Sequence, residues 1–321
     1  MNNTDKIYVA GHQGLVGGAI LKKLEQEGYH NIVTRTHQEL DLIDQAAVDY
    51  FFSVEKPDYV FLAAARVGGI GANSSYPADF IYENTLIGFN VINASYKHGV
   101  KKLMNLGSSC IYHKMAVQPI KEESLLTGEL ELTNDAYALA KISTIKLCAA
   151  YNKQYGTNYL SVMPTNLYGP GDNYDLSTSH VFPALIRKFH EAKVSKTNSV
   201  TLWGDGYPYR EFLYSGDLAE AVVFLMKNKN AEDVRNITGD FINIGSGIDL
   251  SIKELAEIIK NIVYADVPGR TCRIEWDTSQ PNGTPRKLLD ISRMLSLGLS
   301  PNISLKDGIR LTYTDFLSKS Y

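Results

Sequence analysis

The sequence predicts an α/β protein with a doubly wound parallel sheet and a smaller α/β substrate domain. Three observations predict it. Short apolar runs alternate with amphipathic segments through the first half of the chain, glycines follow the first run at three-residue spacing, and 321 residues are enough for about two domains. The composition, 44% hydrophobic and 21% charged, is that of a globular protein with a core.

Each expected element of the first half follows from an apolar run or a helical pattern. Buried strands are expected at residues 6–11, 31–36, 58–65 and 101–108, where apolar residues cluster. Helices are expected at residues 15–28, 44–56 and 77–99, and Pro57 follows the second of them. A further helix carries Tyr137 and runs to about Tyr155. Such alternation is typical of right-handed βαβ units, with helices on both faces of a parallel sheet.

The pattern changes after Tyr168, where turn-forming residues replace the alternation as far as His180. Later segments predict helices at residues 217–227, 251–263 and from about 304, and a strand at 241–247. We assign residues 1–170 plus roughly 211–245 to a nucleotide-binding domain of Rossmann type. Roughly residues 171–210 plus 246–321 form the substrate domain, so the chain crosses between the two more than once.

Charge and composition exclude several classes of partner. A net charge of −3 is too close to neutral for a general nucleic-acid binder. No apolar run reaches the ~20 residues of a membrane span, and the N-terminal segment lacks the features of a signal peptide. Cys110, Cys148 and Cys272 share no metal-ligand spacing, so no metal site is expected. We expect a cytoplasmic protein without a membrane or nucleic-acid partner.

A glycine-rich turn follows the first strand and opens the first helix. Gly11, Gly14 and Gly17 are spaced G-x-x-G-x-x-G. Glycines at these positions let the backbone turn tightly and approach a pyrophosphate, which the N-terminus of the helix then binds. The alternative is a glycine-rich turn without a ligand. The second strand ends with Arg35 and His37 and has no carboxylate before Glu39. A basic residue there favours the 2′-phosphate, so NADP(H) is the expected cofactor.

Three side chains form a candidate proton-transfer set. Tyr137 and Lys141 are four residues apart, so they lie on one face of a helix. A lysine ammonium favours the phenolate and is expected to lower the pKa of the tyrosine from about 10. Such a pair often occurs by chance on a surface. Together with Ser108 at the end of a strand and a dinucleotide turn, it predicts a carbonyl reductase.

Motifs along nearly the whole chain carry a family resemblance: "AGHQGLVG", "LAAARVGGI", "YPADFIYEN", "GSSCIY", "YALAK", "SVMPTNLYGP", "SHVFPAL", "REFL" and "GTPRKLLD". The chain resembles the extended short-chain dehydrogenase/reductase family and, within it, the GDP-L-fucose synthases, which epimerise GDP-4-keto-6-deoxy-mannose at C3 and C5 and reduce it at C4. The resemblance implies that Ser108, Tyr137 and Lys141 are the reductase residues. It implies cofactor contacts from Gly11, Gly14, Leu15, Val16, Gly17, Arg35, Ala64, Lys141, Pro164, Asn166, Leu167 and His180.

The resemblance also gives Cys110 a role. Protons at C3 and C5 are acidic because the C4 carbonyl can hold charge as an enolate, and inversion needs one group to remove a proton and another to return it to the opposite face. Cys110 and His180 match that pair, and Ser108 and Tyr137 would stabilise the enolate oxygen. The alternative is that Cys110 packs as a small hydrophobic residue, as free cysteines usually do.

A GDP-linked 4-keto sugar carries a diphosphate that local cations must neutralise. Candidate cations are Arg187, Lys188, Arg210 and the pair Arg286–Lys287, since guanidinium groups bind phosphate through two donors at once. Trp203 is a candidate to stack on the base or ribose. The substrate-binding set expected here is Ser109, Asn166, Lys188, Trp203, Arg210, Asn282 and Arg286.

The chain departs from the family pattern at positions that gather around the ligand: Gln13, His37, His113, Lys188, Tyr207, Tyr209 and Asn282. Gln13 and His37 replace arginines, which weakens the expected preference for NADP over NAD. One interpretation is neutral drift. The other is a pocket for a related substrate, such as a GDP-4-keto-heptose, reduced at C4 with little or no epimerisation. A non-catalytic nucleotide-binding protein is a third hypothesis, which the intact Ser108, Tyr137 and Lys141 disfavour. The resemblance also implies a homodimer.

Overall fold

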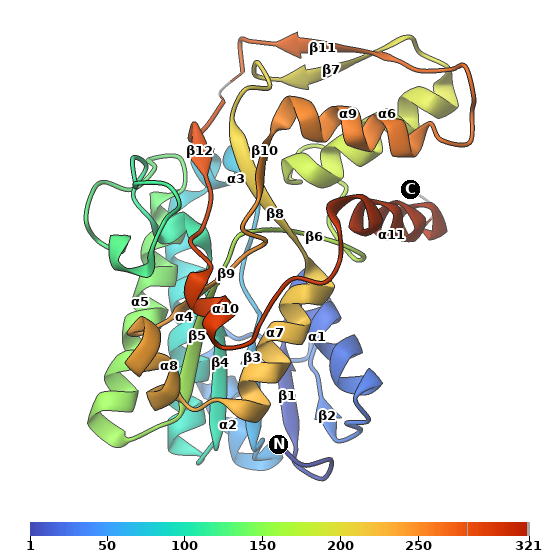
Figure 1. Cartoon of the computed structure of the whole chain (residues 1–321). Coiled ribbons are helices and arrows are strands. Elements are labelled where there is room, and N and C mark those ends of the chain that lie inside the picture. The colour runs from blue at the N-terminus through green and yellow to red at the C-terminus, as the bar shows by residue number, and fades with distance from the viewer. Residues whose placement is uncertain (281, 320–321) are drawn as a thin grey trace.

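The computed structural model describes residues 1–280 and 282–319 (Figure 1). Its larger lobe is built on a six-stranded sheet whose neighbouring strands are all parallel, in the order β2-β1-β3-β4-β5-β9. The strands are β1 (Ile7–Ala10), β2 (Ile32–Val33), β3 (Tyr59–Leu62), β4 (Lys102–Leu106), β5 (Tyr159–Pro164) and β9 (Ile242–Ile244). The expected doubly wound α/β fold is confirmed. After β2 the chain returns to the other side of β1, and a crevice opens at the carboxyl ends of strands at such a reversal.

Helices cover both faces of this sheet (Figure 1). On one face lie α1 (Leu15–Gln26) and α7 (Ser215–Asn228), which share an apolar cluster with the sheet. On the other face, α2 (Gln45–Glu55), α4 (Pro77–Lys97) and α5 (Asp135–Tyr155) enclose a second cluster. A glycine in the left-handed region, Gly156 with φ +67°, ends α5. The predicted positions of these helices are confirmed to within a few residues.

The second lobe lies over the carboxyl ends of the strands (Figure 1). Its small sheet has the order β10-β8-β12, formed by β10 (Asp249–Ser251), β8 (Tyr209–Tyr214) and β12 (Arg286–Lys287). β6 (Asn166–Tyr168) also pairs with β8, and β7 (Ser199–Trp203) pairs with β11 (Arg273–Asp277). The helices α6 (Val181–Ser195), α9 (Ile252–Val263) and α11 (Leu305–Ser318) contribute to a third apolar cluster. The predicted helices at 251–263 and from about 304 are therefore confirmed.

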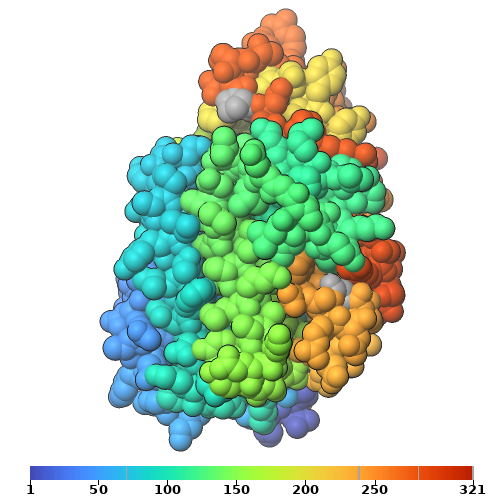
Figure 2. Space-filling view, turned by 90° about the vertical axis from the view of Figure 1, so that its left-hand side faces the viewer, coloured from blue at the N-terminus to red at the C-terminus, as the bar shows by residue number. Residues whose placement is uncertain are grey.

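Three short helices were not expected from the sequence: α3 (Ile70–Ser75), α8 (Ala231–Thr238) and α10 (Ser292–Ser296). The second strand is shorter than predicted, since only Ile32 and Val33 pair with β1. Within the described ranges, every helix is too short or too polar to cross a bilayer. Figure 2 shows α4 and α5 lying side by side on one face of the larger lobe.

Candidate active site

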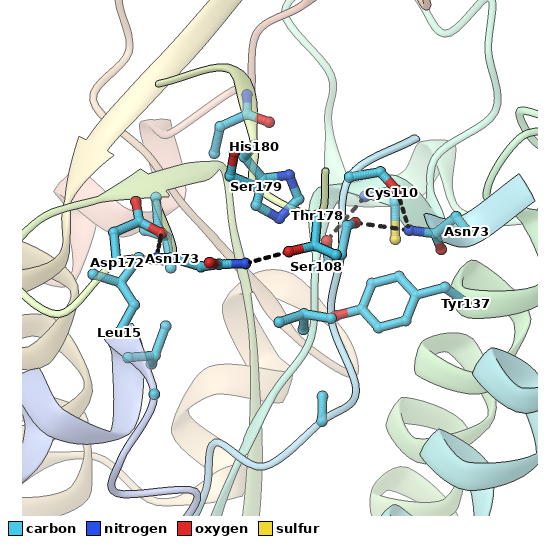
Figure 3. Close-up of a pocket in the computed structure, with 18 of the residues that line it drawn as sticks. Leu15, Asn73, Ser108, Cys110, Tyr137, Asp172, Asn173, Thr178, Ser179 and His180 are labelled. Atoms are coloured by element: carbon cyan, nitrogen blue, oxygen red, sulfur yellow. Dashed lines mark hydrogen bonds between the residues drawn. The ribbon is translucent and has the colours of Figure 1, made fainter. Parts of the chain in front are cut away.

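A cavity of about 1040 Å³ lies between the two lobes, at the carboxyl ends of the central strands. Residues from both lobes line it, and Figure 3 shows its centre. The expected site residues that line it are Gly11, Gly14, Leu15, Val16, Gly17, Arg35, Ala64, Ser108, Ser109, Cys110, Tyr137, Lys141, Pro164, Asn166, Leu167, His180, Lys188, Trp203, Arg210 and Asn282.

The glycine turn has the geometry of a dinucleotide site. Gly11 has φ +83°, and a Cβ on Gly17 would lie 2.1 Å from the carbonyl oxygen of Gly11. Only glycine therefore lets α1 pack directly against the turn. Gly14 is the N-cap residue of α1 and offers no side chain to cap it. The first N–H groups of α1 thus face the cavity side of the turn, where an anion such as a diphosphate fits them.

Arg35 lies on the cavity wall, but its guanidinium group already has partners. Nη2 is 2.6 Å from Glu55 Oε1, and Nη1 donates a hydrogen bond to the carbonyl oxygen of Thr34. His37 is exposed and lies 3.8 Å from Asp41. Arg35 is thus a candidate cation for a 2′-phosphate, two residues beyond the end of β2.

Ser108 and Cys110 are positioned by the end of β4. A short 3-10 helix, Ser109–Ile111, follows the strand, and the Cys110 backbone N–H donates to Ser108 Oγ at 3.4 Å. Cys110 is 8% exposed. Burial raises the pKa of the Cys110 thiol, while the Ser108 hydrogen bond and the charges of Lys287 and Lys141 act in the opposite direction. The thiol is therefore protonated at neutral pH.

Tyr137 and Lys141 both line the cavity, but their electrostatics differ from the expectation. The Lys141 ammonium lies 5.7 Å from the centre of the Tyr137 ring and donates a hydrogen bond to the Leu106 carbonyl oxygen at 2.8 Å. Burial raises the pKa of Tyr137 well above its usual value, and burial lowers the pKa of Lys141 to about 8. The expected lowering of the Tyr137 pKa by the lysine is wrong for this structure, because burial, and to a lesser extent Cys110, raise the pKa of the phenol.

His180 precedes α6 as its N-cap residue and points into the cavity from the side opposite Tyr137 (Figure 3). His180 is exposed toward the cavity, but the protein atoms packed around the imidazole still reduce its contact with solvent. This burial and, to a lesser extent, the charge of Lys287 lower the pKa of His180. The imidazole is therefore neutral at neutral pH, so it can accept a proton while the Cys110 thiol can donate one.

Cations gather at the end of the cavity that the second lobe forms. Arg210 and Lys287 are neighbours across β8 and β12, and burial lowers the pKa of both, that of Arg210 to about 10. Lys188 donates a hydrogen bond to the Thr201 carbonyl oxygen, and Trp203 is 61% exposed. Asn282 bridges to Asp205 in both directions, at 2.7 and 3.0 Å.

Two of the expected cations lie elsewhere. Arg286 is absent from the wall of the cavity, and its guanidinium group binds the carboxylate of Asp249 at 2.5 and 3.1 Å. Consecutive strand residues face opposite sides, so the neighbouring Lys287 lines the cavity instead. Arg187 also lies outside the wall, bound to Glu191 at 2.7 Å. We therefore replace Arg286 by Lys287 in the substrate-binding set.

Polar groups that the sequence did not single out also line the cavity. Six residues on the wall carry a buried side-chain nitrogen or oxygen with neither a hydrogen-bond nor an ion-pair partner among the described residues: His12, Asn73, Thr133, Asn134, Asp172 and Ser179. Buried polar atoms without partners are rare in folded proteins. Their gathering around one cavity indicates that a polar ligand satisfies some of them. No local sequence signal separates them from ordinary loop residues.

Comparison with known proteins agrees with this geometry. The model of the NAD dependent epimerase/dehydratase family matches residues 7–245. The GDP-L-fucose synthase of Escherichia coli is 50% identical over 97% of this chain and 96% of its own length. Two solved structures from Campylobacter jejuni are each 41% identical and cover 99% of both chains. One is a GDP-6-OMe-4-keto-L-xylo-heptose reductase (TM-score 0.93), and the other is a GDP-mannoheptose C4 reductase with NADP bound (TM-score 0.88).

Proposed function

The chain belongs to the NAD dependent epimerase/dehydratase family, and on this premise we propose that it reduces a GDP-4-keto-6-deoxy sugar at C4 with NADPH after epimerising C3 and C5. One observation carries the proposal most directly. Ser108, Cys110, Tyr137 and His180 line the same cavity as a glycine turn suited to a dinucleotide (Figure 3). A hydroxyl, a phenol, a thiol and an imidazole therefore surround one space large enough for a sugar.

Epimerisation uses the thiol and the imidazole. In the resting protein the pair holds one transferable proton, on Cys110, because burial raises the pKa of the thiol and lowers that of His180. One group can therefore remove the proton at C3 or C5 while the other returns one to the opposite face. The hydroxyls of Ser108 and Tyr137 donate hydrogen bonds to the enolate oxygen at C4, where the charge develops.

Reduction uses Ser108, Tyr137 and Lys141. NADPH bound along the glycine turn supplies the hydride that C4 accepts. Tyr137 is protonated, since burial raises its pKa, so its hydroxyl can give a proton to the oxygen at C4 as negative charge develops there. Ser108 orients that oxygen. Lys141, bonded to the Leu106 carbonyl oxygen at 2.8 Å, fixes the face of α5 that carries Tyr137.

The nucleotide end of the substrate meets the second lobe. Arg210 and Lys287 are adjacent cations on the cavity wall. Burial makes each of them costly to charge without a counter-ion, and a diphosphate supplies one. Trp203 and Lys188 lie on the same wall, where the base and ribose of GDP would follow. We propose that Ser109, Asn166 and Asn282 complete the polar contacts.

The deciding experiment is isotope exchange. The protein is incubated with GDP-4-keto-6-deoxy-mannose in D2O without NADPH, and the sugar is analysed by NMR. Deuterium is expected at C3 and C5, and later addition of NADPH should give a reduced product. Cys110→Ser should slow the exchange far more than it slows reduction of a pre-epimerised sugar. Reduction without any exchange would remove the epimerase half of the proposal.

A second candidate is C4 reduction of a GDP-4-keto-heptose with little or no epimerisation. It is favoured by the two heptose reductases that share this fold at 41% identity over nearly the whole chain. Comparing kcat/KM for the 6-deoxy-hexose and the heptose substrates distinguishes the two candidates.

We further propose a cytoplasmic homodimer. The helices α4 and α5, which lie side by side in Figure 2, carry the exposed apolar side chains of Ile81, Tyr82, Phe89, Tyr96, Leu139 and Tyr155. Such a face is suited to a second copy. We also propose that residues 1–170 with roughly 211–245 form the NADP-binding domain, and that the remaining residues form the domain for the nucleotide sugar.

A further inference from the structure

We propose that Asn73 is a positioning residue for epimerisation, because it fixes a turn that ties the His180 loop to the cavity wall beside Cys110. The inference rests on the function proposed above and extends it to a residue outside the acid–base set. Asn73 lines the cavity although it is only 8% exposed. In Figure 3 it lies beside Cys110, on the side away from Asp172.

The amide of Asn73 is held in one orientation. Its Nδ2 donates hydrogen bonds to the carbonyl oxygens of Gly68 at 2.8 Å and Gly69 at 3.1 Å, and its backbone N–H donates to the Gly69 oxygen at 3.1 Å. Both side-chain acceptors are carbonyls, so only the amide nitrogen can face them. Asn73 Oδ1 points the other way and has no partner among the described residues. The side chain thus locks the Gly68–Gly69 turn.

That turn is joined directly to the loop before His180. The Gly69 N–H donates to the Thr178 carbonyl oxygen at 3.1 Å, two residues before the imidazole. A Cβ on Gly69 would lie 2.9 Å from the Ser179 oxygen. The two backbones therefore approach so closely that only glycine fits, and the hydrogen bond depends on this approach.

The loop that receives this hydrogen bond is internally stiff. The Asp175 carboxylate accepts hydrogen bonds from the backbone N–H groups of Ser177 and Thr178 at 3.0 and 3.1 Å. Asn173 Nδ2 donates to Thr178 Oγ1 at 2.9 Å, as drawn in Figure 3. A shift of the turn at Gly69 is therefore passed on to His180 rather than absorbed within the loop. Asn73 in this way sets the position of the imidazole relative to Cys110.

The test replaces Asn73 by aspartate, which has the same shape but cannot donate to the two carbonyls. A carboxylate there also repels the carbonyl oxygens, so the turn should move. Misplacement of a reacting group by about 1 Å can cost ~100-fold in rate. Asn73→Asp should therefore slow deuterium exchange at C3 and C5 at least about 10-fold. Reduction of a pre-epimerised sugar does not need His180 as an acid or base, so it should slow much less than the exchange, and the ratio of exchange to reduction should fall.

Asn84 provides a matched control in the same segment. It is 4% exposed, its Nδ2 donates to the carbonyl oxygens of Arg66 at 3.1 Å and Phe80 at 2.7 Å, and it does not line the cavity. Asn84→Asp removes the same kind of hydrogen bonds without touching the Gly69–Thr178 contact. It should lower the melting temperature and leave the ratio of exchange to reduction unchanged. If Asn73→Asp and Asn84→Asp had the same ratio of deuterium exchange to reduction, the proposal would be overturned.

Two further measurements do not depend on turnover of the epimerase. Gly69→Ala should reproduce the Asn73→Asp effect if that variant is too unstable to assay. In a [15N]histidine-labelled protein, the His180 signal, assigned by its loss in His180→Asn, should shift in Asn73→Asp and not in Asn84→Asp. If the wild type reduces sugar but exchanges no deuterium, the epimerase proposal fails. The NMR comparison then still tests whether Asn73 positions His180. A His180 signal that does not shift in Asn73→Asp rejects that role.

Discussion

Tyr137 and Lys141 are four residues apart on α5, and burial rather than their mutual charge governs both side chains. Burial raises the pKa of Tyr137 and lowers the pKa of Lys141 to about 8. The phenol is therefore protonated, which is the form that the proposed ketone reduction needs. Lys141 acts through its hydrogen bond to the Leu106 carbonyl oxygen.

Tyr137→Phe removes the proton donor and leaves the shape of the cavity nearly unchanged. We expect kcat for reduction to fall at least ~100-fold, the usual contribution of a positioned acid, while the Kd for NADPH changes little. Stopped-flow absorbance of NADPH and fluorescence titration measure the two quantities. Tyr112→Phe is the control, because the Tyr112 ring is buried and its hydroxyl donates to Asn243 Oδ1 outside the main cavity. A similar loss of kcat in both variants would refute the role.

Asp172 is a second residue that burial controls. Its Oδ2 is buried without a hydrogen-bond partner among the described residues, and burial raises its pKa to about 7. The folded state thus binds a proton that the unfolded chain releases near pH 4. The stability from this proton is fully present below about pH 4 and is lost as the pH rises through about 7.

Asp172→Asn should remove this pH dependence. We expect the variant to gain melting temperature relative to the wild type as the pH is raised from 5 to 8, because the wild type then carries a buried charge. The contrast is Asp175→Asn. Hydrogen bonds from Ser177 and Thr178 lower the pKa of Asp175, so its charge stabilises the fold at pH 8 and its loss should destabilise. Thermal melts across this pH range test both, and parallel curves for wild type and Asp172→Asn would contradict the prediction.

Part of the site was predictable from single residues. Cys110, Tyr137 and His180 lie in motifs, and all three line the cavity. Which of Arg286 and Lys287 lines it was not predictable, because that depends on the register of a two-residue strand. Buried polar atoms without partners, such as Asn73 Oδ1, were also not predictable, since whether such an atom has a partner depends on segments far away in sequence.

At the scale of elements, the turn between β1 and α1 shows how packing demands particular residues. A Cβ on Gly17 would meet the Gly11 carbonyl oxygen at 2.1 Å, a contact with backbone that cannot be relieved by rotating a side chain. One residue further along α1, a Cβ on Gly18 would lie 3.3 Å from the His12 oxygen. These neighbouring helical glycines therefore differ sharply in what they tolerate.

Gly17→Ala should push α1 away from the turn and weaken NADPH binding by at least ~100-fold, since the helix N-terminus no longer meets the phosphates. Gly18→Ala should be close to neutral, because alanine favours the helix by up to ~1 kcal/mol and the displacement required is small. Fluorescence titration with NADPH, with melting temperatures as a check on folding, compares the two. Equal affinities would show that the close approach at Gly17 is not required.

The longer elements of the larger lobe were predictable because each of them carries its own local signal. β1 is a continuous apolar run, and β4 is mostly apolar; both strands are buried at every position. The strands of the second lobe lack such a signal. β7 and β11 pair with each other although they lie near residues 200 and 275 of the sequence. Buried and exposed positions alternate in β7. Their pairing is decided by tertiary contacts, which no short window of sequence contains.

At the scale of the whole molecule, two surfaces have proposed binding partners. The cavity between the lobes is the site that we propose for the cofactor and the sugar. The other surface is on α4, where Tyr82, Phe89 and Tyr96 recur every seven residues and remain partly exposed. Tyr96 also stacks on Tyr155 of α5 at 4.3 Å, so the apolar stripe continues onto the neighbouring helix. Two antiparallel copies of this helix pair would bury the stripe as a four-helix bundle.

Phe89→Asp tests this arrangement. In a dimer the aspartate would be buried against an apolar partner without a counter-ion, and such a charge costs several kcal/mol. We expect the wild type to sediment at about twice its 35.7 kDa chain mass and the variant to sediment as a monomer. Val194→Asp is the control, because Val194 is an equally apolar exposed residue on α6, in the other lobe. A monomeric wild type would rule out the dimer. Dissociation of both variants would show that the effect is not specific to the α4 surface.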